Sequence, residues 1–330
     1  MRAAVLEQPA PIETSPLVLR DVPIPSPLTG EALLKVLACG VCHTDLHIAE
    51  GDLPRIKKPV IPGHQIVGEV VKTNDSSLQI GDRVGVAWLG GTDGTCRYCR
   101  TERENLCDHP VFTGYGRDGG FAEYVTVDAR FTYPMPENLP SETAAPLLCA
   151  GAVGYRSLRV ADVKPGTRVG LFGYGASAQM VVPVLLHWGC DVFVATREPD
   201  HQDLARTQGA RWAGPLDEKT PEQLDAAITF APVGNVVISA LQSLSKGGIV
   251  AINAVHLDRI PSFDYDTLLW GERQLRSVAN LTRKDAAEYL QLVANLSWRP
   301  KITPCRLDEI NRVLLDIRES RFTLPYVVIP

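Results

Sequence analysis

The sequence lacks an excess of positive charge, a long apolar run and an apolar segment at its N-terminus. Its 330 residues carry 33 Lys and Arg against 38 Asp and Glu, a net charge of −5, which gives no electrostatic reason to bind nucleic acid or an anionic membrane. Apolar stretches are broken before about 18 residues, so no transmembrane helix is expected. Residues 1–16 lack the apolar core of a secretory signal. We therefore expect a cytoplasmic protein with neither nucleic acid nor membrane as partner.

The composition also lacks the bias of disordered chains. Hydrophobic residues make up 45% of the sequence and charged residues 22%, which is typical of folded proteins. At about 150 residues per domain, the length allows two domains. The eight cysteines need a role other than disulfides in a reducing compartment, and metal binding or catalysis is the usual one.

Residues 1 to about 140 have the pattern of an all-β region. Short apolar runs are separated at short intervals by Gly, Pro, Asp and Asn. This punctuation predicts a barrel or an irregular sandwich. The expected strands are Ala32–Leu37, Ile66–Val71, Arg83–Val86 and Ala122–Val127.

Strand and helix patterns alternate from about residue 141. A helix is expected from Ser141 through Cys149 to Arg159, and the apolar run Thr167–Gly173 precedes another helix over Ala176–His187. Such alternation predicts a parallel sheet with right-handed crossovers. Further strands are expected at Asp191–Thr196, Ala226–Phe230, Ile249–Asn253 and Arg276–Ala279, followed by helices at Asp285–Leu296 and Leu307–Arg318 and a final apolar run at Leu324–Pro330.

A glycine-rich turn joins the first strand of this region to its helix. It reads Gly173-Tyr174-Gly175-Ala176-Ser177-Ala178, the pattern G-x-G-x-x-A. The first glycine permits a tight turn, the second lets the backbone approach a pyrophosphate, and the small third position allows close packing of helix on strand. The helix N-terminus supplies N–H donors and positive potential. A dinucleotide site is the favoured interpretation, and a glycine turn in some other α/β protein is the alternative.

The end of the next strand bears on the choice of cofactor. NAD-binding proteins usually place an acidic residue there, whereas this chain has Thr196-Arg197. A hydroxyl and a guanidinium suit a 2′-phosphate, so we favour NADP(H) over NAD(H). The alternatives are that Arg197 only contacts solvent, or that Glu198 takes the acidic role.

Cysteine and histidine residues form two groups. The first consists of the short segment Cys39–His47, followed by His64 and, far downstream, Cys149. The second places an oxygen and three sulfurs in one loop, and its two-residue spacing lets the backbone curl around a single ion, as in structural zinc sites. A third cysteine at a fitting distance argues against a redox pair or packed thiols. The members of the second group are Asp93, Cys96, Cys99 and Cys107.

These motifs together resemble the zinc-containing alcohol dehydrogenases of the medium-chain dehydrogenase/reductase family, over essentially the whole chain. They stand in the family's order: G-V-C-H-T-D at 40–45, P-G-H at 62–64, the cysteine loop at 96–107, G-G-F-A-E-Y at 119–124, L-L-C-A-G at 147–151 and then the glycine turn. The resemblance implies a barrel-like GroES-like catalytic domain, residues 1–149 and 282–330, and a doubly wound Rossmann domain, residues 150–281.

The resemblance also implies roles for single residues. Cys42, His64 and Cys149 match the ligands of a catalytic zinc, with the fourth position open, and the loop of Asp93 and three cysteines matches a structural zinc site, giving two zinc ions per chain. Thr44 matches the hydroxyl that binds the substrate oxygen, and His47 matches the outer end of a proton relay. Asp45 matches the carboxylate that orients His64, and His43 matches a position near the pyrophosphate. Trp88 matches an aromatic residue that narrows the pocket for small alcohols. Core packing is the alternative for Trp88.

Two departures from the family pattern bear on chemistry. The family usually has cysteine at the position of Asp93, and a carboxylate is an acceptable zinc ligand of the same formal charge; an empty loop is the alternative. The family usually has Glu at the position of Gln65, and a neutral amide there removes a negative charge near the metal, which makes it more electrophilic.

The expected activity is transfer of a hydride between a nicotinamide cofactor and a small primary alcohol or aldehyde. One alternative is an NADP-linked reductase of bulkier, cinnamyl-type aldehydes, against which Trp88 argues. The other is a non-catalytic, NADPH-binding or redox-sensing relative, against which the retained ligands argue. By resemblance the protein is also expected to be a homodimer or homotetramer.

Overall fold

A computed structural model of the chain describes residues 1–54, 57–322 and 324–330. The described chain divides into two compact units. Unit 1 comprises Met1–Cys149, Thr282–Ala294 and Arg299–Pro330, and unit 2 comprises Ala150–Leu281 and Asn295–Trp298. Across these described ranges, no helix combines the length and the apolar character needed to cross a bilayer.

Unit 1 is built on a mainly antiparallel sheet that bends around its longest strand, β3 (Glu31–Gly40). The end of β3 at Cys39 and Gly40 pairs with β17, while its start, Glu31–Lys35, pairs with β8. Register shifts at two places in the β3–β4 ladder let the strand turn between these partners. The strand order is β16-β17-β3-β4-β5-β9, with β1–β2 and β6–β7 as separate ladders.

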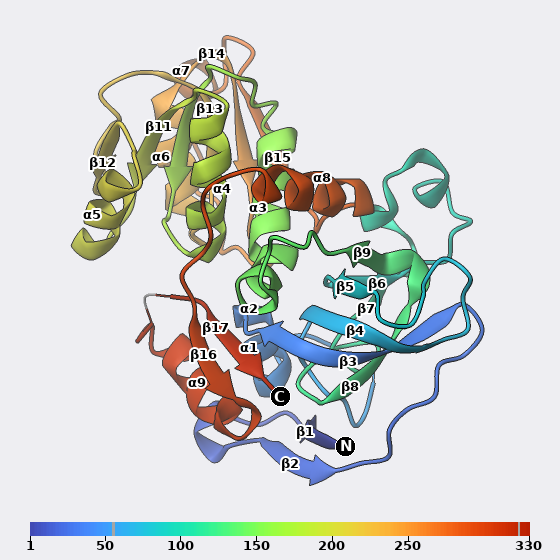
Figure 1. The fold of residues 1–330 in the computed structure, drawn as a ribbon. Helices are drawn as coiled ribbons and strands as arrows, with labels where there is room; N and C mark the ends of the chain where they lie inside the picture. Colours follow the sequence, from blue (N-terminus) through green and yellow to red (C-terminus); the bar gives the residue numbers. More distant parts are fainter. Residues whose placement is uncertain (55–56, 323) are drawn as a thin grey trace. The chain divides into compact units, whose positions relative to one another are not determined.

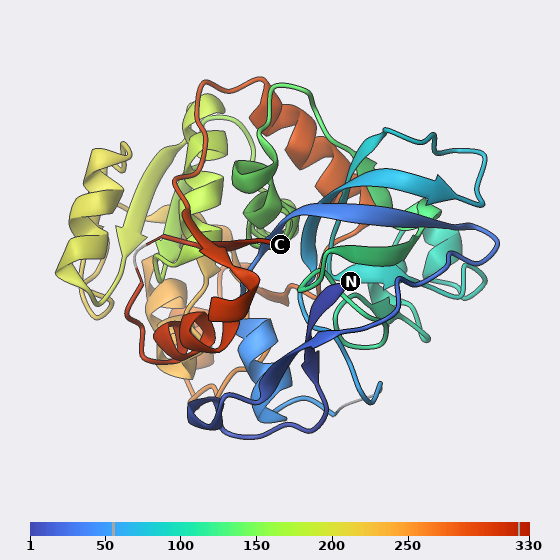
Figure 2. The same ribbon diagram turned by 60° about the horizontal axis from the view of Figure 1, so that its bottom comes forward.

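The elements of unit 1 have the colours from blue through teal to green, and the red of the C-terminal part, in Figure 1. Its strands are β1 Arg2–Leu6, β2 Leu17–Asp21, β3 Glu31–Gly40, β4 Gln65–Thr73, β5 Arg83–Val86, β6 Leu89–Gly91, β7 Val111–Phe112, β8 Tyr124–Asp128, β9 Thr132–Pro134, β16 Thr303–Arg306 and β17 Tyr326–Ile329. Its helices are α1 His43–Glu50, α2 Ser141–Ala144, α8 Arg283–Ala294 and α9 Ile310–Arg318. Figures 1 and 2 both show α9 beside α1, where the two helices are in contact.

Unit 2 is a parallel sheet with the strand order β12-β11-β10-β13-β14-β15. This is the doubly wound order of dinucleotide-binding folds, in which ligands bind where the order reverses, here between β10 and β13. The strands are β10 Arg168–Phe172, β11 Asp191–Ala195, β12 Trp212–Gly214, β13 Leu224–Thr229, β14 Leu244–Ile252 and β15 Gln274–Ser277, and the helices are α3 Ala150–Val160, α4 Ala176–His187, α5 Pro199–Thr207, α6 Gly234–Ser243 and α7 Tyr265–Leu268.

The predicted fold class is confirmed, because unit 1 contains a barrel-like sheet and unit 2 contains a doubly wound parallel sheet. One predicted element is wrong. The helix expected from Ser141 to Arg159 is instead α2, a 3₁₀ turn over Ala145–Leu148 and α3. Pro146 lacks an N–H for a continuous helix, and Cys149 has a non-helical backbone, with φ −125° and ψ −75°. The break places the Cys149 thiol beside His64.

Candidate metal and cofactor sites

Three predicted zinc ligands from distant parts of the sequence meet in unit 1. Cys42 caps α1, His64 immediately precedes β4, and Cys149 follows the 3₁₀ turn, yet their ligand atoms all lie within 4.8 Å of one another. His64 Nε2 is 3.3 Å from Cys149 Sγ, close to the edge of about 3.5 Å that a tetrahedral zinc site has between sulfur and nitrogen. Two thiols and one imidazole form a three-ligand set that fits zinc and leaves one position open.

Asp45 fixes the orientation of this cluster from inside the protein. The carboxylate is fully buried, and its Oδ2 accepts a hydrogen bond from the Cys42 N–H at 2.9 Å. Its Oδ1 accepts from the Gly63 N–H at 3.1 Å and lies 3.2 Å from His64 Nδ1. A carboxylate accepts only, so His64 carries its proton on Nδ1, and Nε2 is left free to bind a metal.

The protonation states in the cluster favour a cation. A hydrogen bond from Cys149 holds the pKa of Cys42 well below its ordinary value, with a further contribution from His64. Burial lowers the pKa of His64, but the charge and hydrogen bond of Asp45 outweigh it and raise that pKa to about 10. A lowered thiol pKa favours the thiolate that a divalent cation binds, and the cation would replace any proton on His64 Nε2.

Two further predicted residues follow Cys42 on α1. Thr44 is half-buried, and its N–H donates to Cys42 Sγ at 3.5 Å, while its hydroxyl oxygen lies 3.6 Å from the same sulfur. His47, one turn later, is partly exposed, and its Nδ1 lies 2.8 Å from Asp52 Oδ2. The sequence analysis did not predict this exposed carboxylate beside His47. The left-handed C-cap at Gly51 turns the chain so that Asp52 faces His47.

Three aromatic side chains, Trp88, Phe112 and Tyr115, form an aromatic wall beside His64. The Trp88 ring meets the His64 ring edge to face, at 5.0 Å between centroids. It stacks on Phe112 at 4.9 Å with an angle of 13° between the planes, and Tyr115 lies 5.9 Å away. The sequence analysis singled out Trp88 but not Phe112 or Tyr115, because these come from beyond the cysteine loop and no spacing links them to Trp88.

Gln65 lies next to the cluster at the start of β4, opposite Gly40 of β3. It is 2% exposed, and its Oε1 has no hydrogen-bond partner. A Cβ at Gly40 would lie 2.9 Å from this oxygen, so the absence of a side chain at Gly40 makes room for the amide. An unpartnered buried carbonyl oxygen is an electron-rich group that could respond to a nearby cation.

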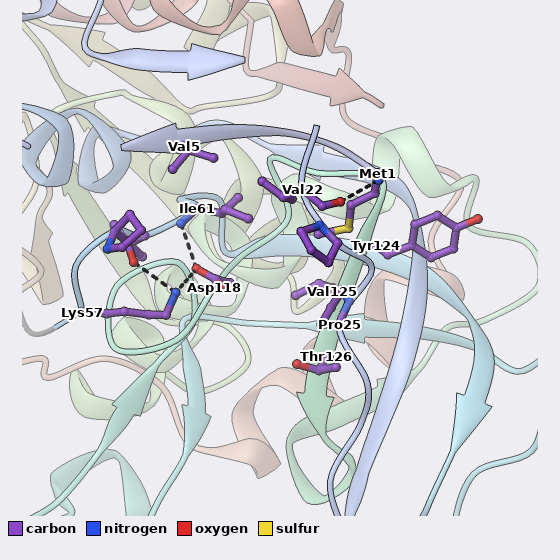
Figure 3. Close-up of a pocket in the computed structure, with 13 residues that line it drawn as sticks. Met1, Val5, Val22, Pro25, Lys57, Ile61, Asp118, Tyr124, Val125 and Thr126 are labelled. Atoms are coloured by element: carbon purple, nitrogen blue, oxygen red, sulfur yellow. Dashed lines mark hydrogen bonds and ion pairs between the residues drawn. The ribbon is translucent and has the colours of Figure 1, made fainter. Parts of the chain in front are cut away.

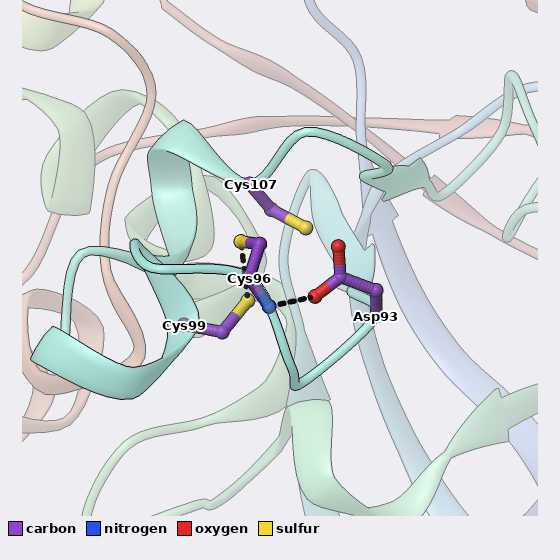
Figure 4. Close-up of side chains that lie close together, drawn as sticks. All are labelled: Asp93, Cys96, Cys99 and Cys107. Atoms are coloured by element: carbon purple, nitrogen blue, oxygen red, sulfur yellow. Dashed lines mark hydrogen bonds between the residues drawn. The ribbon is translucent and has the colours of Figure 1, made fainter.

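The second predicted group also comes together. Ligand atoms of Asp93, Cys96, Cys99 and Cys107 lie within 4.8 Å of one another, and Figure 4 shows the four side chains pointing toward one another. Cys96 Sγ and Cys99 Sγ are 3.6 Å apart, near the sulfur–sulfur edge of about 3.8 Å in a tetrahedral zinc site. Three sulfurs and one carboxylate oxygen therefore fit a closed zinc site.

Backbone N–H groups of the same loop orient the Asp93 carboxylate. Its Oδ1 accepts hydrogen bonds from the N–H groups of Thr95 at 2.8 Å and Cys96 at 2.9 Å. These backbone bonds hold the pKa of the carboxyl well below its ordinary value. Asp93 thus stays charged at any neutral pH, and its orientation is set by the backbone.

The glycine turn has the shape of a phosphate-binding turn. Gly173 has a φ of +93°, and a Cβ there would lie 2.9 Å from the Ala231 nitrogen, so only glycine fits. Gly175, the N-cap of α4, faces open space and has no side chain to cap the helix. Ala178 is fully buried. The N–H groups at Ala176 and Ser177 therefore begin an uncapped helix end that suits an anion.

The residues predicted to select the cofactor differ in exposure. Thr196 is 4% exposed. The Arg197 side chain is 84% exposed, and its Nε lies 2.6 Å from Oε1 of Glu198. His43, predicted near the pyrophosphate, is exposed at the start of α1, 6.1 Å from the Phe322 ring. The guanidinium of Arg197 has terminal nitrogens to offer a ligand, although Glu198 competes for it.

A cavity of about 200 Å³ in unit 1 contains none of the predicted site residues (Figure 3). Its charged pair, Lys57 and Asp118, is neutralised by a contact of 2.6 Å between Nζ and Oδ1. The same oxygen accepts the Ile61 N–H at 3.0 Å. The pair therefore holds the backbone in place just before Pro62-Gly63-His64. We assign the cavity no ligand.

Comparison with known proteins agrees with this geometry. Residues 29–137 match the family described as "Alcohol dehydrogenase GroES-like domain". The chain is 42% identical over 328 residues to "Probable alcohol dehydrogenase AdhA" of Mycobacterium tuberculosis (strain CDC 1551 / Oshkosh), an alignment that covers 97% of this chain and 95% of that protein.

Two solved structures have the same fold but different nicotinamide cofactors. CAD from Helicobacter pylori, complexed with NADP(H), has a TM-score of 0.87 at 24% identity and covers 100% of this chain and 99% of that one. Acetophenone reductase from Geotrichum candidum, in complex with NAD, has a TM-score of 0.86 at 26% identity and covers 100% and 97%. The fold alone therefore does not determine whether NAD(H) or NADP(H) is the preferred cofactor. The full-length relative shows that the chain belongs to the zinc-type medium-chain alcohol dehydrogenases, as the motifs of the sequence indicated.

Proposed function

We propose that this oxidoreductase depends on zinc and transfers a hydride between NADP(H) and a small primary alcohol or aldehyde. The observation that carries the proposal is the set of Cys42, His64 and Cys149, whose ligand atoms converge within 4.8 Å and supply three ligands rather than four. Three protein ligands with an open position are the pattern of catalytic zinc, and four are the pattern of structural zinc.

Each residue near the cluster has a proposed task. Zinc held there would act as a Lewis acid that polarises the oxygen of an alcohol or aldehyde. Asp45 keeps the His64 ring in the tautomer that exposes Nε2. The Thr44 hydroxyl, 3.6 Å from Cys42 Sγ, hydrogen-bonds the substrate oxygen. His47, with Asp52 at 2.8 Å, passes the substrate proton to solvent.

The substrate range is proposed from the aromatic wall. Trp88 is held between His64 and Phe112 with centroid distances of 5.0 and 4.9 Å. A ring that packs against both neighbours cannot easily move aside for a large substrate. Small aliphatic aldehydes are therefore proposed to be better substrates than aromatic ones, in contrast to a cinnamyl-type reductase.

The cofactor preference is proposed from the end of β11. The exposed guanidinium of Arg197 and the hydroxyl of Thr196 suit a 2′-phosphate, and Glu198 follows too late to take the place of the usual acidic residue. The uncapped N-terminus of α4 is proposed to bind the pyrophosphate, with His43 as a further contact.

A spectrophotometric panel tests the proposal. Oxidation of NADPH and NADH is followed with acetaldehyde, isobutyraldehyde, benzaldehyde and cinnamaldehyde, before and after treatment with a zinc chelator. We expect the highest kcat/KM with NADPH and acetaldehyde, and activity that is lost with the chelator and restored by zinc. A Cys190→Ser variant is the matched control for Cys42→Ser, because Cys190 is a buried thiol outside both clusters.

The possible results distinguish the proposed function from its alternatives. A strong preference for NADH would refute the assignment of Arg197. Turnover that survives complete removal of zinc would refute the role of the metal. Binding of NADPH without turnover of any aldehyde would favour a non-catalytic relative. Light scattering on the purified protein tests the further proposal of a homodimer or homotetramer.

A further inference from the structure

The second metal cluster and the aromatic wall are parts of one hairpin. Trp88 immediately precedes β6 (Leu89–Gly91), and Phe112 ends β7 (Val111–Phe112), which pairs with β6 in antiparallel fashion. The segment that joins the two strands, residues 92–110, contains the whole cluster of Asp93, Cys96, Cys99 and Cys107. A metal bound by these four residues would therefore link the two ends of the joining segment, and so hold together the two strands next to which Trp88 and Phe112 lie.

The ladder of this hairpin is short, although β6 is buried and Glu104 of the joining segment accepts a hydrogen bond from the Arg283 N–H at 2.8 Å. β6 has three residues and β7 has two, and these two strands form a sheet of their own. Two-stranded hairpins are marginal in water, and a long connecting loop adds an entropic cost of closure. The Thr113 N–H donates to the Trp88 carbonyl at 2.9 Å, which adds one hydrogen bond at the open end of the ladder.

The chain that follows Phe112 is held by more hydrogen bonds and by close packing. The Phe112 carbonyl oxygen accepts hydrogen bonds from the N–H groups of Gly116 at 2.9 Å and Arg117 at 3.2 Å. Gly114 packs so closely on the turn before His64 that a Cβ would lie 2.9 Å from the Gly63 nitrogen. Loosening the loop would therefore weaken the pairing of β6 with β7 and the stack of Trp88 on Phe112, while the segment after Phe112 and the His64 turn keep their shape.

We propose that the metal in the loop acts on substrate choice: by closing the β6–β7 hairpin, it holds Trp88 against Phe112 and His64, and Phe112 is a positioning residue for that wall. This inference rests on the proposed function, since it needs zinc in the loop and substrate beside Trp88. Loss of the loop metal should leave the three ligands of the first site in place and widen the space beside them.

The test compares three substitutions and uses a fourth, Trp88→Phe, as the spectroscopic reference. Asp93→Ala removes one loop ligand, and Asp108→Ala is its matched control, because Asp108 is an exposed aspartate of the same loop outside the cluster. Phe112→Ala breaks the stack without touching a ligand. Zinc per chain, the near-ultraviolet circular dichroism that disappears in Trp88→Phe, and the ratio of kcat/KM for benzaldehyde to that for acetaldehyde are measured for each protein.

We expect Asp93→Ala to retain one zinc, to lose the signal of Trp88 and to raise the benzaldehyde ratio about threefold to tenfold, the range that an aromatic pair contributes. Phe112→Ala should give the same spectroscopic and kinetic change with two zinc ions, and Asp108→Ala should match the parent. If Asp93→Ala does not fold, stepwise chelation of the parent protein gives the same three readouts.

Other outcomes overturn the inference. Loss of the second zinc with an unchanged Trp88 signal and ratio would show that the loop and the wall are independent. A parent protein with one zinc would refute the loop site itself. Absence of all turnover would refute the proposed function, yet zinc content and the Trp88 signal would still report whether the loop metal orders the wall.

Discussion

Replacement of Asp45 by Asn offers a direct test of how the cluster of Cys42, His64 and Cys149 is held. Three N–H donors converge on the two carboxylate oxygens, from Cys42 at 2.9 Å, Gly63 at 3.1 Å and His64 at 3.2 Å. Asparagine has a single acceptor oxygen, and its NH₂ group would face at least one of these donors. The substitution therefore leaves a buried N–H without a partner.

The magnitude follows from that orphaned donor. A buried unsatisfied polar group costs about 1–3 kcal/mol, so the free energy of unfolding of the zinc-free protein should fall by that amount. Loss of a carboxylate behind a ligand histidine typically weakens metal binding by about tenfold to a hundredfold. At about 1.4 kcal/mol for each factor of ten, this is roughly 1.4–2.8 kcal/mol of binding free energy.

Urea unfolding of the zinc-free protein and competition with a chelator of known affinity measure the two quantities separately. Asp264→Asn is the matched control, because Asp264 caps α7 through the Thr267 N–H and asparagine caps a helix about as well as aspartate. A zinc affinity within about threefold of the parent and an unfolding free energy within about 0.5 kcal/mol would refute the role assigned to Asp45.

Four other predictions concern single residues. Arg197→Ala should raise KM for NADPH about tenfold and leave KM for NADH nearly unchanged, since a charged hydrogen bond to phosphate is lost; an equal rise for both cofactors would contradict the 2′-phosphate contact. Gln65→Glu should change kcat or shift the pH–rate profile, because it adds a charge beside His64; identical curves would deny this position a role. Asp52→Asn should slow turnover about twofold to fivefold in dilute buffer, since its pair with His47 is exposed, and imidazole buffer should restore the rate. Burial raises the pKa of Cys305 to about 12, so at pH 8 only about one thiol in ten thousand is ionised, and mass spectrometry should find this cysteine unalkylated by iodoacetamide in the folded protein.

Local patterns predicted the regular elements well. The helix expected over Ala176–His187 has those bounds in the structure, and the strand expected at Arg83–Val86 has them too. The predicted helix from Ser141 to Arg159 failed because helical propensity on both sides of Pro146 concealed a break that tertiary contacts impose at Cys149.

The candidate site could be predicted only where its residues belong to motifs. The spacing of the cysteine loop and the family order of the ligands led to both clusters, whose ligand atoms the structure brings together. Phe112 and Asp52 escaped prediction because their importance arises from a stacking contact and a turn that bring them to Trp88 and His47. Such contacts leave no regular spacing in the sequence from which they could be predicted.

The two clusters differ in how much chain must be folded before each exists. Asp93 and Cys107 lie in one loop, so a growing polypeptide can wrap this segment around an ion soon after its synthesis. Cys149 and His64, in contrast, are separated by 85 positions, and loop closure over that span needs most of the bent sheet in place. If both clusters bind zinc as proposed, the loop can take up its ion while the chain is still being made, whereas the cluster of Cys42, His64 and Cys149 can be loaded only after folding. Under that proposal, a shortage of zinc would give molecules with a filled loop and a vacant three-ligand cluster.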